Sequence, residues 1–329
     1  WLVCPAARSA KWTDVPVAFG AVGRGCTPAR AAGPPHPAAD PIFISKGAQL
    51  AHGGLSLSLK HVAEREMAGR QGAVVVLAAG DGPILAVSDL ERAARRRARP
   101  GSAVKPFTLL ALLREGVAGP DTTLRCRRRL RLAGRDHDCS HPETGALLDP
   151  VKALAYSCNS WFAQAAARLR PDALARVLEE YGLGSATGLA EDEAPGIVRL
   201  ARTPEQLRLQ AIGEASVEVT PVGLAAAYRR LARLDGEARR GLEPLFAGLR
   251  GAVEFGTGRA AAAPGLAVAG KTGTAMSRSL AWPHGWFAGF APADAPEIVV
   301  AVFLENGRGG PDAAPIAGAV FRAHAREAA

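Results

Sequence analysis

The chain is organised around one stretch, Pro100-Gly101-Ser102-Ala103-Val104-Lys105-Pro106-Phe107, which we interpret as a tight turn leading into an apolar helix from Phe107 to Leu113. Residues three apart share one face of a helix, with Cβ atoms about 5–6 Å apart, so Lys105 is predicted to reach the hydroxyl of Ser102. The first N–H groups of a helix have no intrahelical partner. The N–H of Ser102 is therefore free to face a developing oxyanion. The stretch predicts a serine nucleophile with a lysine as its base.

Composition limits the class of protein. The 329 residues, 48% of them hydrophobic, can bury one substantial core, either as one large domain or as two interleaved subdomains. The net charge of +9 accompanies a bias toward Ala, Arg, Gly and Pro along the whole chain, so we expect no nucleic-acid partner. The chain begins at Trp1 without an initiator Met, and no run reaches the roughly 18 apolar residues of a membrane span. A membrane anchor would therefore lie upstream of Trp1.

The cysteines are too few and too scattered for a disulfide scaffold; they stand at positions 4, 26, 126, 139 and 158. Cys126 and Cys139 flank an Arg-rich segment and could pair in an oxidising compartment. A zinc site of His137, Cys139 and His141 is the other interpretation, but no C-x-x-C pair supports it. Free thiols or one disulfide are favoured, and we expect no metal and no cofactor.

Hydrophobic periodicity predicts strands at both ends of the chain and helices between them. Residues 1–52 are rich in Pro, Ala and Gly and are interpreted as an arm or linker. The alternation of Leu55-Ser-Leu-Ser-Leu59 predicts a strand, and Ser160 is expected to cap a helix that starts at Trp161. The basic segment 121–148 is too polar to be core. The other predicted strands are 73–78, 84–87, 266–274, 285–291 and 298–305, and the other predicted helices are 60–67, 150–156, 172–181, 204–212, 221–234 and 314–326.

Three short motifs carry the chemistry. Attack on an amide needs a nucleophile, a base, a proton donor for the leaving amine and an oxyanion site. Ser-x-x-Lys occurs at Ser102, Ser-x-Asn at Ser157 and Lys-Thr-Gly at Lys271. Each motif alone is as easily a helix cap, a turn or an edge strand, but their order and their positions at element boundaries make chance improbable.

With these motifs the sequence resembles the penicillin-binding protein transpeptidases. The resemblance spans about residues 55 to 322 and implies an α/β (α+β) fold, in which an antiparallel sheet of about five strands is flanked by helices beside an all-helical lobe at about 102–255. Residues 53–329 would form the transpeptidase domain, after a reduced pedestal. The blocks that carry the resemblance are Arg99-Pro-Gly-Ser-Ala-Val-Lys-Pro-Phe107, Ala211-Ile-Gly213, Val219-Thr-Pro221, Gly256-Thr257, Gly270-Lys-Thr-Gly-Thr-Ala275 and Gly285-Trp-Phe-Ala-Gly-Phe290.

The resemblance also implies a role for each motif residue. Catalytic roles fall to Ser102, Lys105, Ser157 and Lys271, and substrate-binding roles to Asn159, Thr272, Gly273 and Thr274. Ser102 would be acylated, Lys105 would take its proton, and Ser157 would relay a proton to the leaving D-alanine. Asn159 would hold a side-chain amide of the substrate. The terminal carboxylate would meet Lys271 and the two threonine hydroxyls, and the backbone N–H groups of Ser102 and Thr274 would form the oxyanion hole.

The implied substrates are peptidoglycan stem peptides ending in D-Ala-D-Ala, and β-lactams would acylate the same serine. The implied location is outside the cytoplasm, in the periplasm or on the outer face of the membrane, within a cell-wall synthesis complex. One departure is Glu214-Ala215, where the family usually has a polar residue and glycine. For Lys105 to act as a base, its pKa must fall from about 10.4 toward about 7–8.

Rival interpretations use the same serine and lysine. A D,D-carboxypeptidase remains open, because the motifs do not encode the acceptor. A serine β-lactamase or β-lactam sensor is disfavoured, since no Glu-x-x-Leu-Asn segment lies between Asn159 and Lys271, and since Asn159 departs from the Ser-x-Val of class D enzymes. An inactive wall-binding module is disfavoured because the catalytic residues are intact.

Overall fold

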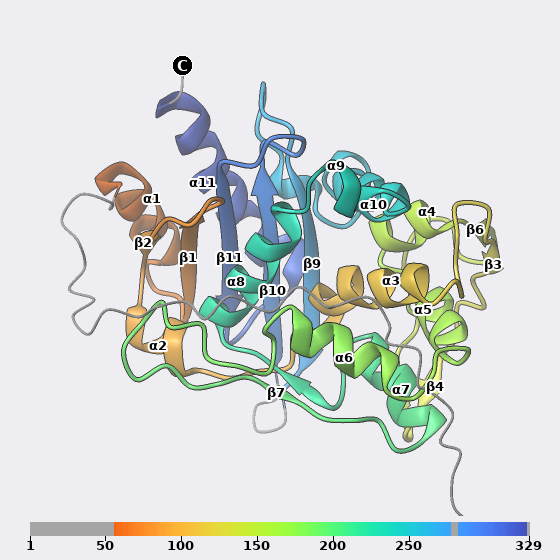
Figure 1. Ribbon diagram of the computed structural model, residues 1–329. Helices are drawn as coiled ribbons and strands as arrows, with labels where there is room; N and C mark the ends of the chain where they lie inside the picture. The colour runs from red at the N-terminus through yellow and green to blue at the C-terminus, as the bar shows by residue number, and fades with distance from the viewer. Residues whose placement is uncertain (1–55, 278–281, 328–329) are drawn as a thin grey trace, which may run out of the picture. The chain divides into compact units, whose positions relative to one another are not determined.

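The computed structural model describes residues 56–277 and 282–327 (Figure 1). All of them belong to one compact unit, residues 46–329. The predicted arm, residues 1–52, lies outside the described residues. None of the helices in the described part of the chain is both long and apolar enough to cross a membrane.

A five-stranded sheet joins the two ends of the chain. Its strand order is β2-β1-β11-β10-β9, and every neighbouring pair is antiparallel. The predicted sheet is therefore confirmed, and β9, which carries Lys-Thr-Gly, is an edge strand. The strands are β1 (Gly72–Ala78), β2 (Ile84–Val87), β9 (Ala269–Met276), β10 (Pro283–Ala291) and β11 (Ile298–Leu304).

Helices cover both faces of this sheet (Figure 1). Side chains of a strand alternate between faces. Val74 and Val76 of β1 pack in one core cluster with α1 (Leu57–Met67) and α11 (Ala314–Glu327). Val75 and Leu77 belong to the other cluster, with α8 (Pro221–Ala232). The sheet is thus the middle layer, and both of its faces are buried.

The prediction of a strand at Leu55–Leu59 is wrong. Leu55 lies outside the described residues, and helix α1 begins at Leu57. The hydroxyl of Ser56 accepts a hydrogen bond of 3.1 Å from the N–H of Leu59, so Ser56 is the N-cap of the helix. Leu59 and Val62 are buried at helical spacing whereas Leu57 is exposed. The short alternation was the start of an amphipathic helix.

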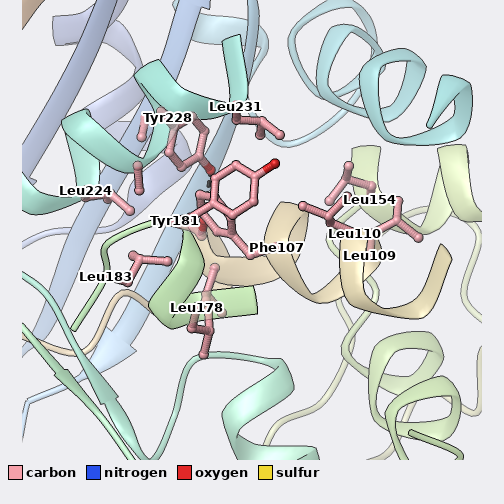
Figure 2. Close-up of a cluster of buried hydrophobic side chains, with 14 of the residues drawn as sticks. Phe107, Leu109, Leu110, Leu154, Leu178, Tyr181, Leu183, Leu224, Tyr228 and Leu231 are labelled. Atoms are coloured by element: carbon pink, nitrogen blue, oxygen red, sulfur yellow. Dashed lines mark hydrogen bonds between the residues drawn. The ribbon is translucent and has the colours of Figure 1, made fainter. Parts of the chain in front are cut away.

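A helical lobe adjoins the β9 edge, and its central helix is α3 (Lys105–Arg114), which follows the 3₁₀ turn η1 (Gly101–Val104). Figure 2 shows side chains of α3 packed with those of neighbouring helices. The ring of Phe107 lies 5.3 Å from that of Tyr181 and 5.6 Å from that of Tyr228. The other helices and turns are α2 (Leu90–Arg95), α4 (Pro150–Ala155), α5 (Asn159–Ala166), α6 (Ala173–Glu180), α7 (Pro204–Ala211), α9 (Gly236–Arg239), α10 (Glu243–Glu254), η2 (Arg259–Ala261) and the π-helical turn η3 (Gly309–Ala313).

Two predictions for the lobe are corrected. Helix α5 begins at Asn159 rather than Trp161, because Cys158, not Ser160, is its N-cap and accepts from the N–H of Trp161. Helices α9 and α10 were not predicted. The prediction that the segment 121–148 is too polar to be core is wrong, because the segment contributes buried side chains to the core, among them Leu132 and Leu148. Its short strands are β3 (Leu124–Arg125), β4 (Arg131–Leu132), β5 (Arg135–Asp136) and β6 (Leu147–Leu148), and β7 (Ile197–Val198) pairs with β8 (Val217–Glu218) further along the chain.

Candidate active site

The turn that carries Ser102 packs directly against strand β9. Gly101 has a φ of +52°, and a Cβ there would overlap the backbone of Thr274. A Cβ at Gly273 would likewise overlap the carbonyl oxygen of Pro100. Because neither position has a side chain, the turn and the strand approach at backbone distance. This close approach brings Ser102 beside the Lys-Thr-Gly motif.

Lys105 is fully buried and bonded to the Ser-x-Asn motif. Its Nζ donates to the carbonyl oxygen of Ser157 at 2.7 Å, to Oδ1 of Asn159 at 2.6 Å and to Oγ of Ser157 at 3.3 Å. The predicted contact with the Ser102 hydroxyl is not among the hydrogen bonds of Nζ in the described part of the chain, because Ser157 and Asn159 engage the ammonium instead. Residues i and i+3 eclipse in a 3₁₀ turn, so the two side chains still rise from the same face.

Burial lowers the pKa of Lys105 to about 8, and the nearby Cys158, Cys139 and Glu214 act in the opposite direction. Removing an ammonium from water disfavours its charged form. A lysine with this pKa is partly neutral near pH 8, which an ordinary lysine is not. Lys105 can therefore act as a proton acceptor.

The connector between α4 and α5 holds Ser157 in an uncommon backbone conformation. Its φ is +59°, in the left-handed region that non-glycine residues rarely adopt. The N–H of Ser157 donates to Leu154, and the N–H of Cys158 to Ala153, so the connector is fixed to the end of α4. Such conformations persist only where the surroundings enforce them, and they cluster at functional sites.

Asn159 links Lys105 to the segment 121–148. While its Oδ1 accepts from Lys105, its amide nitrogen donates to the carbonyl oxygen of His137 at 3.0 Å. The expectation that Asn159 binds a substrate amide stays a prediction. In the structure both polar ends of its side chain are engaged by the protein.

Lys271 lies on β9, also fully buried, and donates to the carbonyl oxygen of Thr272 at 3.0 Å. Burial lowers its pKa well below the usual value, and the charge of Lys105 lowers it further. The Nζ of Lys271 also donates to the hydroxyl of Thr272 at 3.4 Å, so the two polar groups lie together. The hydroxyl of Thr272 shares a hydrogen bond of 2.6 Å with that of Thr257, and the hydroxyl of Thr274 accepts from the N–H of Gly309.

Glu214 belongs to the site although none of the three motifs contains it. It follows Gly213, whose carbonyl oxygen accepts from the N–H of Gly101 at 3.2 Å. Burial raises the pKa of Glu214 to about 7, although Arg99, 3.8 Å away, opposes the shift. Its negative charge raises the pKa of Lys105. The only signal in the sequence was the acidic residue where the family usually has an uncharged one.

Four side chains behind the connector form a second cluster: Cys126, Cys139, His141 and Cys158 are all buried, with their ligand atoms within 4.8 Å of one another. All three cysteines are free thiols, so the suggested Cys126–Cys139 disulfide is not formed. The alternative zinc interpretation of the sequence grouped His137 with Cys139 and His141, but His137 is not in the cluster. The cysteines at 126 and 158 were missed because the loop that joins them to the others has no recognisable ligand spacing. Among the described residues, this cluster is the group that could hold a metal ion.

A family model and several known proteins match the chain. Residues 72–240 and 241–322 match the family model described as penicillin binding protein transpeptidase domain. The chain is 28% identical to peptidoglycan D,D-transpeptidase MrdA of Acinetobacter baumannii, over 81% of this chain and 52% of that protein. The chain thus spans about half the length of this curated relative.

Two solved structures share the fold. The D,D-transpeptidase domain of a peptidoglycan glycosyltransferase from Eggerthella lenta superposes with a TM-score of 0.74 at 24% identity, covering 83% of this chain and 82% of that one. A penicillin-binding protein (PBP2) of Helicobacter pylori, solved in complex with MreC, gives a TM-score of 0.74 at 20% identity, covering 83% and 63%.

Proposed function

The chain belongs to the penicillin-binding protein transpeptidase domain family, and from this premise we propose that it is a peptidoglycan D,D-transpeptidase working through an acyl-serine intermediate on Ser102. The donor is a stem peptide that ends in D-Ala-D-Ala, and the acceptor is an amine of a second stem peptide. Residues 53–329 form the transpeptidase domain in this proposal.

The reaction begins at Ser102. Its Oγ attacks the carbonyl carbon between the two D-alanines while neutral Lys105 accepts the hydroxyl proton. Ser157, 3.3 Å from Nζ of Lys105, relays a proton to the nitrogen of the leaving D-alanine as the amide bond breaks. The acceptor amine then attacks the ester, its proton returns through the same groups, and Ser102 is released.

The backbone around Ser102 supplies the oxyanion site. The two donors are the N–H of Ser102, on the turn, and the N–H of Thr274, on β9. The absence of side chains at Gly101 and Gly273 lets the turn and the strand lie at backbone distance. The terminal carboxylate of the donor binds beside Lys271, with Thr272 and Thr274 on the same strand. Since β9 is a sheet edge, an extended peptide can add to it as a further strand.

One observation carries the proposal: buried Lys105 bonds to both Ser157 and Asn159, three residues after a serine whose turn abuts the Lys-Thr-Gly strand. Three motifs far apart in the sequence thus meet at one place. An inactive wall-binding module would have no need of a buried lysine whose pKa is lowered to about 8.

The same proposal covers location and partners. Peptidoglycan is cross-linked outside the cytoplasm, so the domain acts in the periplasm or on the outer face of the membrane. β-Lactams acylate Ser102 in place of the stem peptide. A cell-wall synthesis complex is the proposed setting, in keeping with the complex of the Helicobacter pylori relative with MreC.

Labelling with a fluorescent penicillin tests the proposal. We expect one covalent label per chain, mapped by mass spectrometry to the peptide that contains Ser102, and none on Ser102→Ala with its circular dichroism unchanged. An exchange assay, in which a D-Ala-D-Ala peptide acquires a labelled D-amino acid, tests the acyl transfer. Labelling of Ser102→Ala at the rate of the parent protein would refute the proposed nucleophile.

A further inference from the structure

Thr257 follows helix α10 and lies outside the three motifs that the proposed reaction uses. Its N–H donates to the carbonyl oxygen of Ala155, the last residue of α4, at 3.1 Å. A Cβ at the neighbouring Gly256 would overlap that same oxygen, and a Cβ at Gly310 would lie 3.0 Å from the carbonyl oxygen of Thr257. The backbone of Thr257 is therefore held between α4, which leads into the connector, and the turn η3.

The side chain of Thr257 contacts the Lys-Thr-Gly strand. Its Oγ1 is 2.6 Å from Oγ1 of Thr272, which is short for a hydrogen bond between two hydroxyls. Nζ of Lys271 donates to the same Thr272 oxygen at 3.4 Å. Two polar groups therefore converge on one hydroxyl of the motif, and one of them comes from outside the motif.

The hydrogen-bonding capacity of Thr272 indicates what this arrangement does. A hydroxyl has one proton to donate and two lone pairs with which to accept. Lys271 occupies one lone pair. If Thr257 donates its proton as well, both lone pairs are occupied and the proton of Thr272 is left for a third group. Among the described residues, Thr257 and Lys271 are the hydrogen-bond partners of that hydroxyl, so the third group would be a ligand.

We propose that Thr257 is a positioning residue for the terminal carboxylate of the donor peptide, and that it acts through the hydroxyl of Thr272. This inference rests on the proposed function, in which that carboxylate binds beside Lys271 and Thr272. Thr257 donates to Thr272, and Thr272 donates to a carboxylate oxygen of the donor or of a penicillin. Thr257 thereby favours ligands that carry a free carboxylate over ligands that do not.

The charge of the ligand makes this short chain of hydrogen bonds stronger than its neutral parts. A hydrogen bond to a carboxylate is stronger than one between neutral groups. Hydrogen bonds in a chain also polarise one another, so a Thr272 hydroxyl that donates to a carboxylate becomes a better acceptor for Thr257. An ester in place of the carboxylate would remove this charge. The contribution of Thr257 should therefore depend on the charge of a group that it does not touch.

Two ligands and two variants test this dependence. Benzylpenicillin has the carboxylate, and its methyl ester does not; acylation of Ser102 by each is followed by mass spectrometry as a second-order rate constant. Thr257→Val keeps the branched shape and removes the hydroxyl. It should slow acylation by the free acid about three- to tenfold and leave the rate with the ester unchanged. Thr257→Ser should restore the ratio of the two rates. Equal losses with both ligands, or no loss with the free acid, would overturn the proposal.

Thr220→Val is the matched control. The hydroxyl of Thr220 is buried and accepts from the N–H of Gly223 at 3.0 Å, so its loss weakens the start of α8 without touching β9. The melting temperature should fall, while the ratio of acid to ester rates should stay at the parent value. If Thr220→Val changes this ratio as much as Thr257→Val does, the ratio reports stability and the proposal fails. Thr257→Ala also lacks the hydroxyl and gives the same test should valine prevent folding.

A double variant separates an action through Thr272 from an independent one. Thr272→Val should lower the ratio at least as much as Thr257→Val, and combining the two changes should cost nothing further. Additive losses would show that Thr257 does not act through Thr272. The parent protein distinguishes the two levels of proposal: if benzylpenicillin does not acylate Ser102 at all, the proposed function fails. If it does and Thr257→Val leaves the ratio unchanged, only the role of Thr257 fails.

Discussion

Lys105 and Asn159 are joined by a hydrogen bond of 2.6 Å between Nζ and Oδ1, and the amide nitrogen of Asn159 holds the carbonyl of His137 at 3.0 Å. The hydrogen-bond partners that position the candidate base therefore come from Ser157 and Asn159, and not from its own helix α3. Through Asn159, its position also depends on the segment 121–148. The role of Asn159 thus includes fixing Lys105.

Asn159→Ala should slow acylation by penicillin about 10- to 100-fold. A hydrogen bond to a charged group contributes about 1.5–3 kcal/mol, and each 1.36 kcal/mol on a barrier is a factor of about ten in rate. Stopped-flow acylation measures the effect. Gln164→Ala is the control, because Gln164 lies on the same helix and also bonds to the segment 121–148, at the carbonyl of Arg125. Equal losses in the two variants would mean that Asn159 acts only through packing.

Lys105→Arg should be nearly as inactive in acylation as Lys105→Ala. Arginine keeps the positive charge but cannot give up its proton in a protein. Lys105 is also fully buried, so the larger guanidinium would have to displace neighbouring atoms. Second-order rate constants for penicillin labelling compare the two variants. Recovery of most of the acylation rate by arginine would show that the lysine acts only by its charge.

The acylation rate should rise with pH and level off above about pH 8. Lys105 must be neutral to accept the proton of Ser102, and burial lowers its pKa to about 8. Below that pH the ammonium form dominates, so each lower pH unit should reduce the rate about tenfold. Acylation rates measured from pH 6 to pH 10 give the midpoint of the pH profile, at which the rate is half of its plateau value. A rate that falls across this range would exclude Lys105 as the base.

Glu214→Gln should move that midpoint to lower pH. The carboxylate raises the pKa of Lys105, so its replacement by a neutral amide removes a stabilising partner of the ammonium. Because burial brings the pKa of Glu214 itself to about 7, the parent profile should also show a second inflection there, absent from the variant. A midpoint that does not move would show that Glu214 is electrostatically remote from the base.

Gly273→Ala should destabilise the fold by about 1–3 kcal/mol, the usual range for overpacking. The new methyl would overlap the carbonyl of Pro100 and push the Ser102 turn away from β9, so acylation should fall as well. Gly80→Ala is the matched control, since a Cβ there meets nothing within 4 Å. Melting temperatures measure the stability of both variants, and penicillin labelling rates measure their acylation. Normal acylation by Gly273→Ala would mean that the close approach is not required.

Sequence patterns predicted the sheet and the central helix because these depend on local periodicity. The motif residues were recognised by their short fixed spacings, and their roles stay a prediction. The start of α1 was missed because five alternating residues also fit a capped amphipathic helix, and only the cap at Ser56 distinguishes them. The thiol cluster was missed because its residues are separated by loops and have no recognisable spacing in the sequence. Cys126 and Cys158 come together through the packing of the segment 121–148 on α5, which no local pattern encodes.

The acyl-enzyme formed with penicillin should persist for many minutes after excess antibiotic is removed. Hydrolysis of the ester requires a positioned water and a base to activate it. Lys105, Lys271 and Glu214 are titratable candidates for this base. Lys105 is already assigned to the acylation step, Lys271 is fully buried, and Glu214 is 3.8 Å from the guanidinium of Arg99. Mass spectrometry over time measures the surviving adduct, and a chromogenic cephalosporin reports turnover. Rapid turnover that is abolished by Glu214→Gln would identify this carboxylate as a deacylating base and move the chain to the hydrolases.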